Sequence, residues 1–132
     1  MKHSLALVAL ALAPAFAAPS QAFYRALHQV ETGKRLGPII GDNGAALGPL
    51  QIHERYWRDA GVPGRYADCA DLAYSKRVVS AYLRKYAPAA WHRNDVVVLA
   101  RIHNGGPRGA TKQATSRYAS KVVAALRKEA TP

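Results

Sequence analysis

Apolar residues recur at helical spacing in five parts of the chain, and this pattern predicts a mainly helical protein. The first helix follows Ser20, a good N-terminal cap, carries Phe23, Leu27 and Val30 on one side, and ends at Gly33. The other four are expected at residues 53–60, residues 69–86, residues 95–103 with Asn94 as cap, and from Thr111 onward with Tyr118, Val122 and Leu126 buried. Gly61, Pro88 and the Gly105-Gly-Pro107 run supply the breaks between them.

Residues 36–50 break the helical pattern, because they contain four glycines and two prolines. Ile39-Ile40 on one side and Leu50-Gln51-Ile52 on the other predict two short β-segments joined by a loop. The run at residues 96–100 would also suit a buried strand, since short apolar runs do not separate the two structures. The expected fold is therefore mainly α, of the α+β kind, with about five helices and a small β-hairpin after the first helix of the mature chain.

The N-terminus has the pattern of a secretory signal peptide. Lys2 and His3 precede an apolar run at residues 5–12, and small residues follow at residues 15–18. The run is too short to span a bilayer as a mature helix, although a permanent N-terminal anchor is the alternative. We therefore expect a signal peptide at residues 1–18, one domain at residues 19–132, and a secreted or periplasmic product.

Length and composition narrow the classes of function. A chain of 132 residues has room for one domain, and its single cysteine, Cys69, excludes an internal disulfide framework and a cysteine zinc site. The net charge of +11 favours an anionic partner. Nucleic acid is the competing partner, but the signal sequence and the lack of a recognition motif argue against it. We expect a monomer that acts on anionic cell-envelope polymers, without nucleic acid, metal or cofactor.

Two of the eight acidic residues have positions suited to catalysis. Glu31 comes at the end of the first helix, where the negative end of the helix dipole favours a protonated carboxyl group, as a general acid requires. Asp42 follows eleven residues later in Gly41-Asp-Asn-Gly44. Two such carboxyl groups facing each other across a cleft would serve as proton donor and as nucleophile or stabiliser in glycosidic cleavage. The alternatives are a Glu31 ion pair with Lys34 or Arg35, and an Asp42 that bonds its own turn.

Four segments resemble the invertebrate-type (destabilase-like) lysozymes, in matching order and over about residues 23–118. They are His28-Gln-Val-Glu-Thr-Gly33, Gly48-Pro-Leu-Gln-Ile-His53, Tyr56-Trp-Arg-Asp-Ala60 and Ala100-Arg-Ile-His-Asn-Gly-Gly-Pro-Arg-Gly109. The resemblance implies a lysozyme-like fold and a bacteriolytic muramidase, which hydrolyses the β-1,4 bond between N-acetylmuramic acid and N-acetylglucosamine in peptidoglycan. It also implies that Glu31 is the acid and Asp42 the second carboxylate.

Further candidates for the binding of substrate accompany the two carboxyl groups. They are Gln51, Tyr56, His103, Asn104 and Gly105, for each of which a purely structural role is the alternative. Gln51 would bond an acetamido group or Asp42, Tyr56 would stack on a sugar ring, and Gly105 would let the backbone approach a ligand closely.

The chain also departs from the animal members of this family. It lacks their many cysteines, and Ala45-Ala-Leu47 replaces the expected serine and cysteine, which puts in doubt the isopeptidase activity of some relatives. Two other functions remain open: a lytic transglycosylase that uses Glu31 alone, and a non-catalytic basic module that binds the cell wall.

Overall fold

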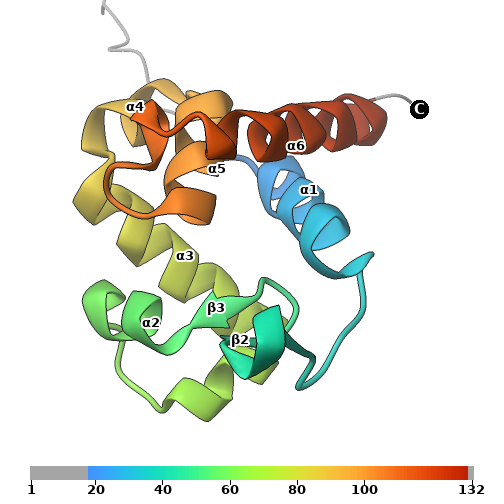
Figure 1. The fold of residues 1–132 in the computed structure, drawn as a ribbon, viewed down its shortest axis with the longest axis vertical. Helices are drawn as coiled ribbons and strands as arrows, with labels where there is room; N and C mark the ends of the chain where they lie inside the picture. The colour runs from blue at the N-terminus through green and yellow to red at the C-terminus, as the bar shows by residue number, and fades with distance from the viewer. Residues whose placement is uncertain (1–17, 131–132) are drawn as a thin grey trace, which may run out of the picture.

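The computed structural model describes residues 18–130, and these residues form a mainly helical fold with a small sheet, as the sequence predicted (Figure 1). The six α-helices are α1 Gln21–Thr32, α2 Glu54–Ala60, α3 Leu72–Tyr86, α4 Pro88–Arg93, α5 Val96–Gly105 and α6 Ala114–Ala130. The strands are β1 Ile40–Gly41, β2 Ala46–Leu47 and β3 Ile52–His53, and the 3₁₀ turns are η1 Asp42–Gly44, η2 Tyr66–Ala70 and η3 Gly109–Thr111. The predicted signal peptide lies, except for Ala18, outside the described residues and stays a prediction.

Helix α1 begins and ends where its sequence predicts. Phe23 and Leu27 are fully buried and Val30 is partly buried. Gly33 ends the helix with a φ of 62°, a conformation that glycine adopts without strain. Ser20 occupies the N-cap position, but its side chain makes no capping hydrogen bond. The helix is therefore fixed by its buried face and by the glycine, not by its cap.

The segment after α1 forms three strands, not the two that the sequence predicted. The strands pair antiparallel in the order β1-β2-β3, with Ile40 opposite Leu47 and Leu47 opposite Ile52. The middle strand, Ala46–Leu47, has only two residues. A pair is too short to show the alternation by which a strand is recognised, so sequence reasoning missed it.

Two predicted helix starts are wrong, and in each case an aspartate caps the helix at another position than the one predicted. Helix α3 starts at Leu72 and not at Cys69, since the Asp71 side chain accepts a hydrogen bond from the Tyr74 backbone N–H at 2.7 Å. Asn94 does not cap α5: it ends α4 with a φ of 52°, and Asp95 caps α5 through the Val98 N–H. Helix α5 also settles the ambiguity at residues 96–100 in favour of a helix.

Pro88 marks the end of α3 as predicted, since this helix stops at Tyr86, but Pro88 is also the first residue of an additional helix, α4. The first position of a helix tolerates proline because its N–H would be unpaired in any case. The predicted start of the last helix is wrong. Thr111 lies in η3, and α6 starts only at Ala114. Helix α2 and the end of α5 before Gly106 agree with the prediction to within two residues.

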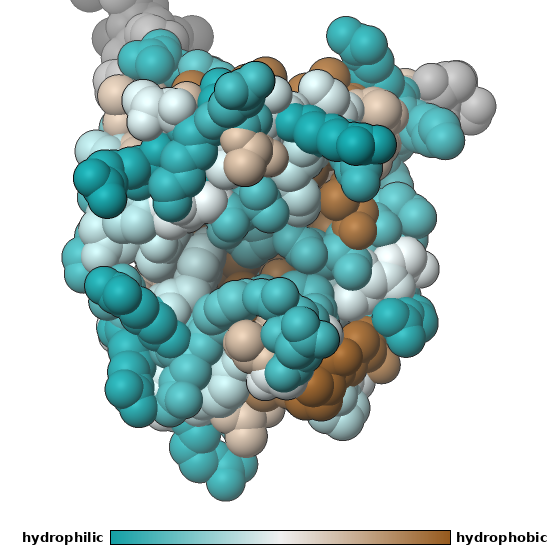
Figure 2. All heavy atoms as spheres, in the orientation of Figure 1, coloured by the Kyte–Doolittle hydropathy of each residue, from teal (hydrophilic) through white to brown (hydrophobic). Residues whose placement is uncertain are grey.

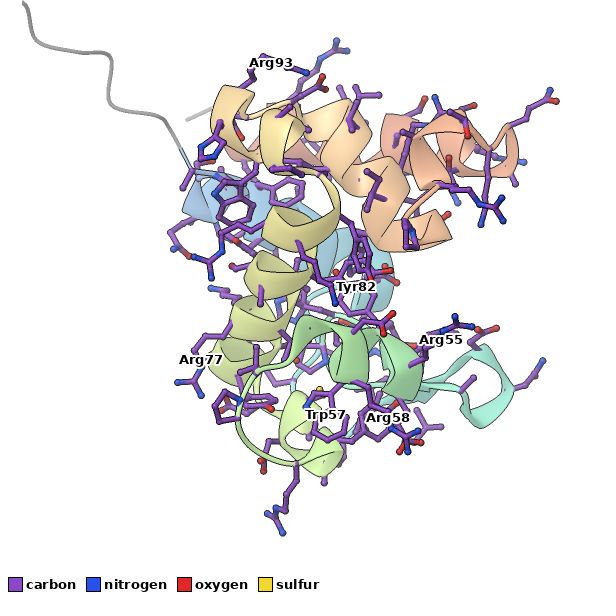
Figure 3. All side chains as sticks on the ribbon, turned by 90° about the vertical axis from the view of Figure 1, so that its left-hand side faces the viewer. Arg55, Trp57, Arg58, Arg77, Tyr82 and Arg93 are labelled. Atoms are coloured by element: carbon purple, nitrogen blue, oxygen red, sulfur yellow. The ribbon has the colours of Figure 1, made fainter. Side chains whose placement is uncertain are left out.

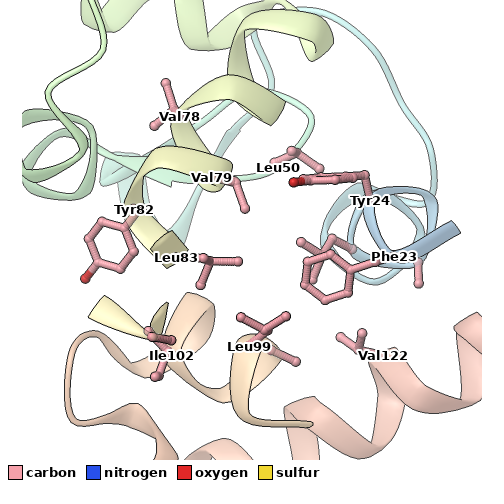
Figure 4. Packing of buried hydrophobic residues seen from close by; sticks show 14 of the residues in the cluster. Phe23, Tyr24, Leu50, Val78, Val79, Tyr82, Leu83, Leu99, Ile102 and Val122 are labelled. Carbon is pink, nitrogen blue, oxygen red and sulfur yellow. The ribbon is translucent and has the colours of Figure 1, made fainter. Parts of the chain in front are cut away.

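The buried core joins the helices around α3. The fully buried residues that pack there include Phe23 of α1, Leu83 of α3, Leu99 of α5 and Val122 of α6 (Figure 4). Helices α1, α4, α5 and α6 form a helical lobe, whereas the sheet, α2 and η2 form a sheet lobe (Figure 1). Helix α3 runs through both lobes and fixes their spacing.

Within residues 18–130, none of the helices combines the length and apolar character needed to cross a membrane.

Candidate active site

A cleft of about 980 Å³ lies between the helical lobe and the sheet lobe. Figure 2 shows it as a hollow whose surroundings are mostly hydrophilic. Six of the seven predicted site residues line it: Glu31, Asp42, Gln51, Tyr56, His103 and Asn104. The fold therefore brings together residues as far apart in the sequence as Glu31 and Asn104.

Glu31 lies in the last turn of α1, and its side chain, 18% exposed, reaches the cleft. The Tyr118 hydroxyl donates a hydrogen bond of 2.6 Å to Oε1 of Glu31, and Nε2 of His103 lies 3.3 Å from the same oxygen. The alternative of an exposed ion pair with Lys34 or Arg35 is wrong. Lys34 pairs with Glu129 at 2.6 Å, and Arg35 donates to the Thr32 carbonyl.

A buried aromatic network supports the neighbours of Glu31. The His103 side chain is only 3% exposed, and its Nδ1 lies 3.0 Å from the Tyr56 hydroxyl. Tyr56 in turn stacks on Tyr82, with ring centroids 3.6 Å apart. With both ring nitrogens of His103 placed against hydrogen-bonding partners, the imidazole and the carboxyl group have a fixed relative orientation.

Two tyrosines of this network keep their protons at ordinary pH. Burial raises the pKa of Tyr118 well above its usual value, and the nearby Glu31 carboxylate raises it further. Burial, with Tyr82 beside it, likewise raises the pKa of Tyr56. Tyr118 therefore remains a neutral donor toward Oε1 of Glu31.

Asp42 stands in a different environment, on the η1 turn between β1 and β2. Its side chain is 63% exposed, and its Oδ2 lies 3.0 Å from Nε2 of His53, the last residue of β3. Within the described residues the Asp42 carboxylate forms no hydrogen bond to the turn's own backbone, contrary to the turn interpretation. Asp42 and Asn43 both have left-handed backbones, with φ of 50° and 53°.

The remaining candidates differ in what they contact. The Gln51 side-chain amide donates to the carbonyls of Ile39 and Gly48, at 3.2 and 3.0 Å, so it ties the sheet together while it lines the cleft. Asn104 is exposed in the cleft wall. Gly105 does not line the cleft: a side chain there would meet Thr115 of α6, so this glycine serves the packing of α5 against α6.

The cleft or network residues that sequence reasoning missed include His53, Arg55, Arg108 and Tyr118. Tyr118 was expected only as an apolar position of the last helix, and it lies 87 residues from its partner Glu31. No local motif could have connected the two. Three or more potential metal ligands do not cluster anywhere in residues 18–130.

Comparisons with known proteins identify the family of this chain. The profile of the family described as Destabilase matches residues 23–125. The chain is 40% identical to lysozyme 1 of Crassostrea virginica over 80% of its own length and 59% of that protein, and 38% identical to a lysozyme of Magallana gigas over 78% and 77%.

Two solved lysozyme structures are similar to this chain in both fold and sequence. The lysozyme of Meretrix lusoria, crystallised in complex with Aeromonas hydrophila PliI, has a TM-score of 0.67 and 32% identity, and the match covers 79% of this chain and 88% of that one. Tapes japonica lysozyme has a TM-score of 0.65 and 30% identity over 80% and 91% of the two chains. Sequence, fold and cleft thus lead to one conclusion: the chain belongs to the Destabilase family of lysozyme-type glycosidases.

Proposed function

We propose that this chain is a muramidase that hydrolyses the β-1,4 bond between N-acetylmuramic acid and N-acetylglucosamine in peptidoglycan. The observation that carries the proposal is the pair of carboxyl groups in one cleft, Glu31 from the helical lobe and Asp42 from the sheet lobe. One is mostly enclosed and the other is mostly exposed, at 18% and 63%. Such contrasting environments suit a proton donor and an ionised partner.

Glu31 is the general acid in this proposal. The Tyr118 hydroxyl and Nε2 of His103 both contact Oε1 of Glu31. In this proposal the other oxygen, Oε2, carries the proton that is transferred. This proton goes to the glycosidic oxygen as the bond to the anomeric carbon breaks. The Tyr118 O–H, which points at the carboxylate, stabilises the negative charge left on Glu31. Glu31 then takes a proton from the water that attacks the anomeric carbon, which completes hydrolysis and restores the acid.

Asp42 is the nucleophile or electrostatic stabiliser. His53 holds Oδ2 of Asp42, so the second oxygen is available to face the positive charge that develops on the sugar ring. The left-handed backbone at residues 42 and 43 keeps this carboxylate at the tip of the η1 turn, beside the cleft.

A lytic transglycosylase is the second candidate, and the concentration of the buried network around Glu31 favours it. That reaction needs one carboxyl group: it protonates the leaving oxygen and then takes the proton of the substrate's own hydroxyl, which attacks the anomeric carbon and forms an anhydro product. The buried network serves Glu31 in either reaction, whereas only the hydrolase needs Asp42.

Mass spectrometry of the soluble products from purified peptidoglycan tests the proposal. Wild type is compared with Glu31→Gln and Asp42→Asn, each close in shape to the original residue. Loss of the general acid should lower the rate by about 100-fold or more. Reducing muramic acid ends that disappear in both variants would support the two-carboxylate hydrolase.

Other outcomes separate the alternatives. Anhydro ends that persist in Asp42→Asn would assign the protein to the transglycosylases. A wild type that binds the wall but releases nothing would leave only the non-catalytic wall-binding module. Circular dichroism of each variant serves as the control for folding.

The location of this activity is part of the proposal. The N-terminal pattern at residues 1–18 would deliver the mature chain outside the cytoplasm, where peptidoglycan is found. The high positive charge would draw the enzyme to anionic wall polymers, and the monomeric state stays a prediction.

A further inference from the structure

Most arginines in the described residues are already engaged with the protein itself. Ion pairs, hydrogen bonds or aromatic rings occupy Arg25, Arg35, Arg58, Arg65, Arg77, Arg84, Arg93 and Arg101. Arg55 and Arg108 are different: both are exposed, both line the cleft, and neither side chain forms an ion pair or hydrogen bond within residues 18–130. Two guanidinium groups at the proposed active site therefore have no ion-pair or hydrogen-bond partner in the described residues, although Arg55 lies near enough to Tyr82 to lower the pKa of its hydroxyl.

The two arginines come from opposite lobes. Arg55 projects from α2 in the sheet lobe, on the side of the molecule opposite Arg77 (Figure 3). Arg108 lies between α5 and η3, in the helical lobe. A ligand in the cleft would thus have a free guanidinium group on each wall.

The other charged groups of the cleft leave these two cations available. The carboxylate of Asp42 contacts His53, and that of Glu31 contacts Tyr118 and His103. The ammonium group of Lys112 donates to the Gly105 carbonyl at 2.5 Å. Asp59 follows Arg55 by four residues on α2, yet its carboxylate makes no ion pair with Arg55 within the described residues.

We propose that Arg55 and Arg108 bind carboxylates of the peptide that peptidoglycan carries on its muramic acid residues. This inference rests on the proposed function and adds the basis of substrate selection. Guanidinium groups pair with carboxylates through two parallel N–H···O bonds, which gives both affinity and orientation. Chitin has the same β-1,4 linkage but no such carboxylates, so the arginines would distinguish the two polymers.

The test compares two forms of one substrate. Soluble, uncrosslinked glycan strands bearing stem peptides are prepared free of other wall polymers, and one half is converted to the amide form with carbodiimide and ammonia. The kcat and KM of wild type, Arg55→Gln, Arg108→Gln and the double variant are measured on both forms. Arg77→Gln, which removes the same charge far from the cleft, is the control.

Amidation should raise the wild-type KM while kcat changes little, because the contact binds ground state and transition state equally. Each single variant should raise the KM on the native form by about three- to tenfold, the range for a charge-assisted hydrogen bond near solvent. On the amide form the substitutions should have no effect, and Arg77→Gln should match wild type on both.

Two results would overturn the inference. If the cleft variants raised the KM equally on the native and amide forms, the arginines would not bind the carboxylates. If Arg77→Gln raised the KM as much as the cleft variants did, the effect would come from the net charge of the protein alone. Binding of both forms to Glu31→Gln, with and without the arginine substitutions, is measured by calorimetry as well. A wild type without activity would then count against the proposed function, while the carboxylate preference is still decided by binding.

Discussion

At the scale of single residues, Glu31 depends on partners that the sequence does not place near it. Its Oε1 accepts a hydrogen bond from the hydroxyl of Tyr118 in α6 and lies 3.3 Å from Nε2 of His103 in α5. His103, predicted to bind substrate, lines the cleft with a side chain that is only 3% exposed. The orientation of the proposed acid is thus set by two other helices.

Replacement of Tyr118 by phenylalanine tests this dependence. We expect kcat to fall by about tenfold with KM nearly unchanged, because a hydrogen bond to a charged group is lost while the ring stays in place. Steady-state kinetics on soluble peptidoglycan fragments measures it. Tyr24→Phe is the matched control, since it removes a hydroxyl that bonds Ser80 and does not line the cleft. A Tyr118→Phe enzyme with wild-type kcat would contradict the proposed role of the hydroxyl.

At the scale of elements, the sheet that carries Asp42 is held by close backbone packing. Gly48 has a φ of 83°, and a side chain there would run into the backbone carbonyl of Cys69 in η2. The Gln51 amide bonds the Gly48 carbonyl in the same turn. Position 48 therefore has no room for a side chain between the sheet and η2.

We expect Gly48→Ala to lower the free energy of unfolding by about 3 kcal/mol or more, from backbone strain together with the clash against a rigid carbonyl. Gly44→Ala is the control: its φ is 93°, but nothing lies within 4 Å of the added carbon, so only strain of about 1 kcal/mol applies. Denaturant unfolding of both variants gives the comparison. If both variants lost the same free energy of unfolding, the clash with Cys69 would add nothing to the backbone strain.

At the scale of the whole molecule, α3 joins two lobes whose cleft holds the proposed chemistry, and the core around it contains buried ionisable groups. Burial raises the pKa of Tyr82 to about 12, with Tyr86 adding to the shift. Burial likewise raises the pKa of the Cys69 thiol to about 12, with a smaller effect of Asp68. Both groups hold their protons more tightly in the folded chain than in the unfolded one.

The fold should therefore lose stability in alkali. The unfolded chain releases these protons from about pH 9 to 10, and the folded chain releases them only near pH 12, so the native state binds more protons across that window. The contribution is complete below pH 9 and falls as pH rises, by about 1.4 kcal/mol per pH unit for each such group. Denaturant unfolding at a series of pH values from about 8 to 11 measures the slope. Tyr82→Phe should make it shallower, and an unchanged slope would exclude Tyr82 as a contributor.

The sequence by itself determined the elements and the candidates for chemistry. Gly33 and Gly61 end helices because glycine adopts a left-handed backbone without strain. The apolar spacing of α1 and α3 is a local signal that packing confirms. The four motifs indicated the family, and they supplied Glu31 and Asp42 as candidates because both residues lie in or beside those short segments.

Only the tertiary structure decided which side chains meet. The Tyr118 bond to Glu31 spans 87 residues, and the contact of His53 with Asp42 depends on a strand too short to predict. Whether Asn94 or Asp95 caps α5 was likewise settled by the additional helix α4, since both residues are suitable caps. Local patterns act over a few residues, whereas a cleft forms between surfaces that packing brings together from the whole chain.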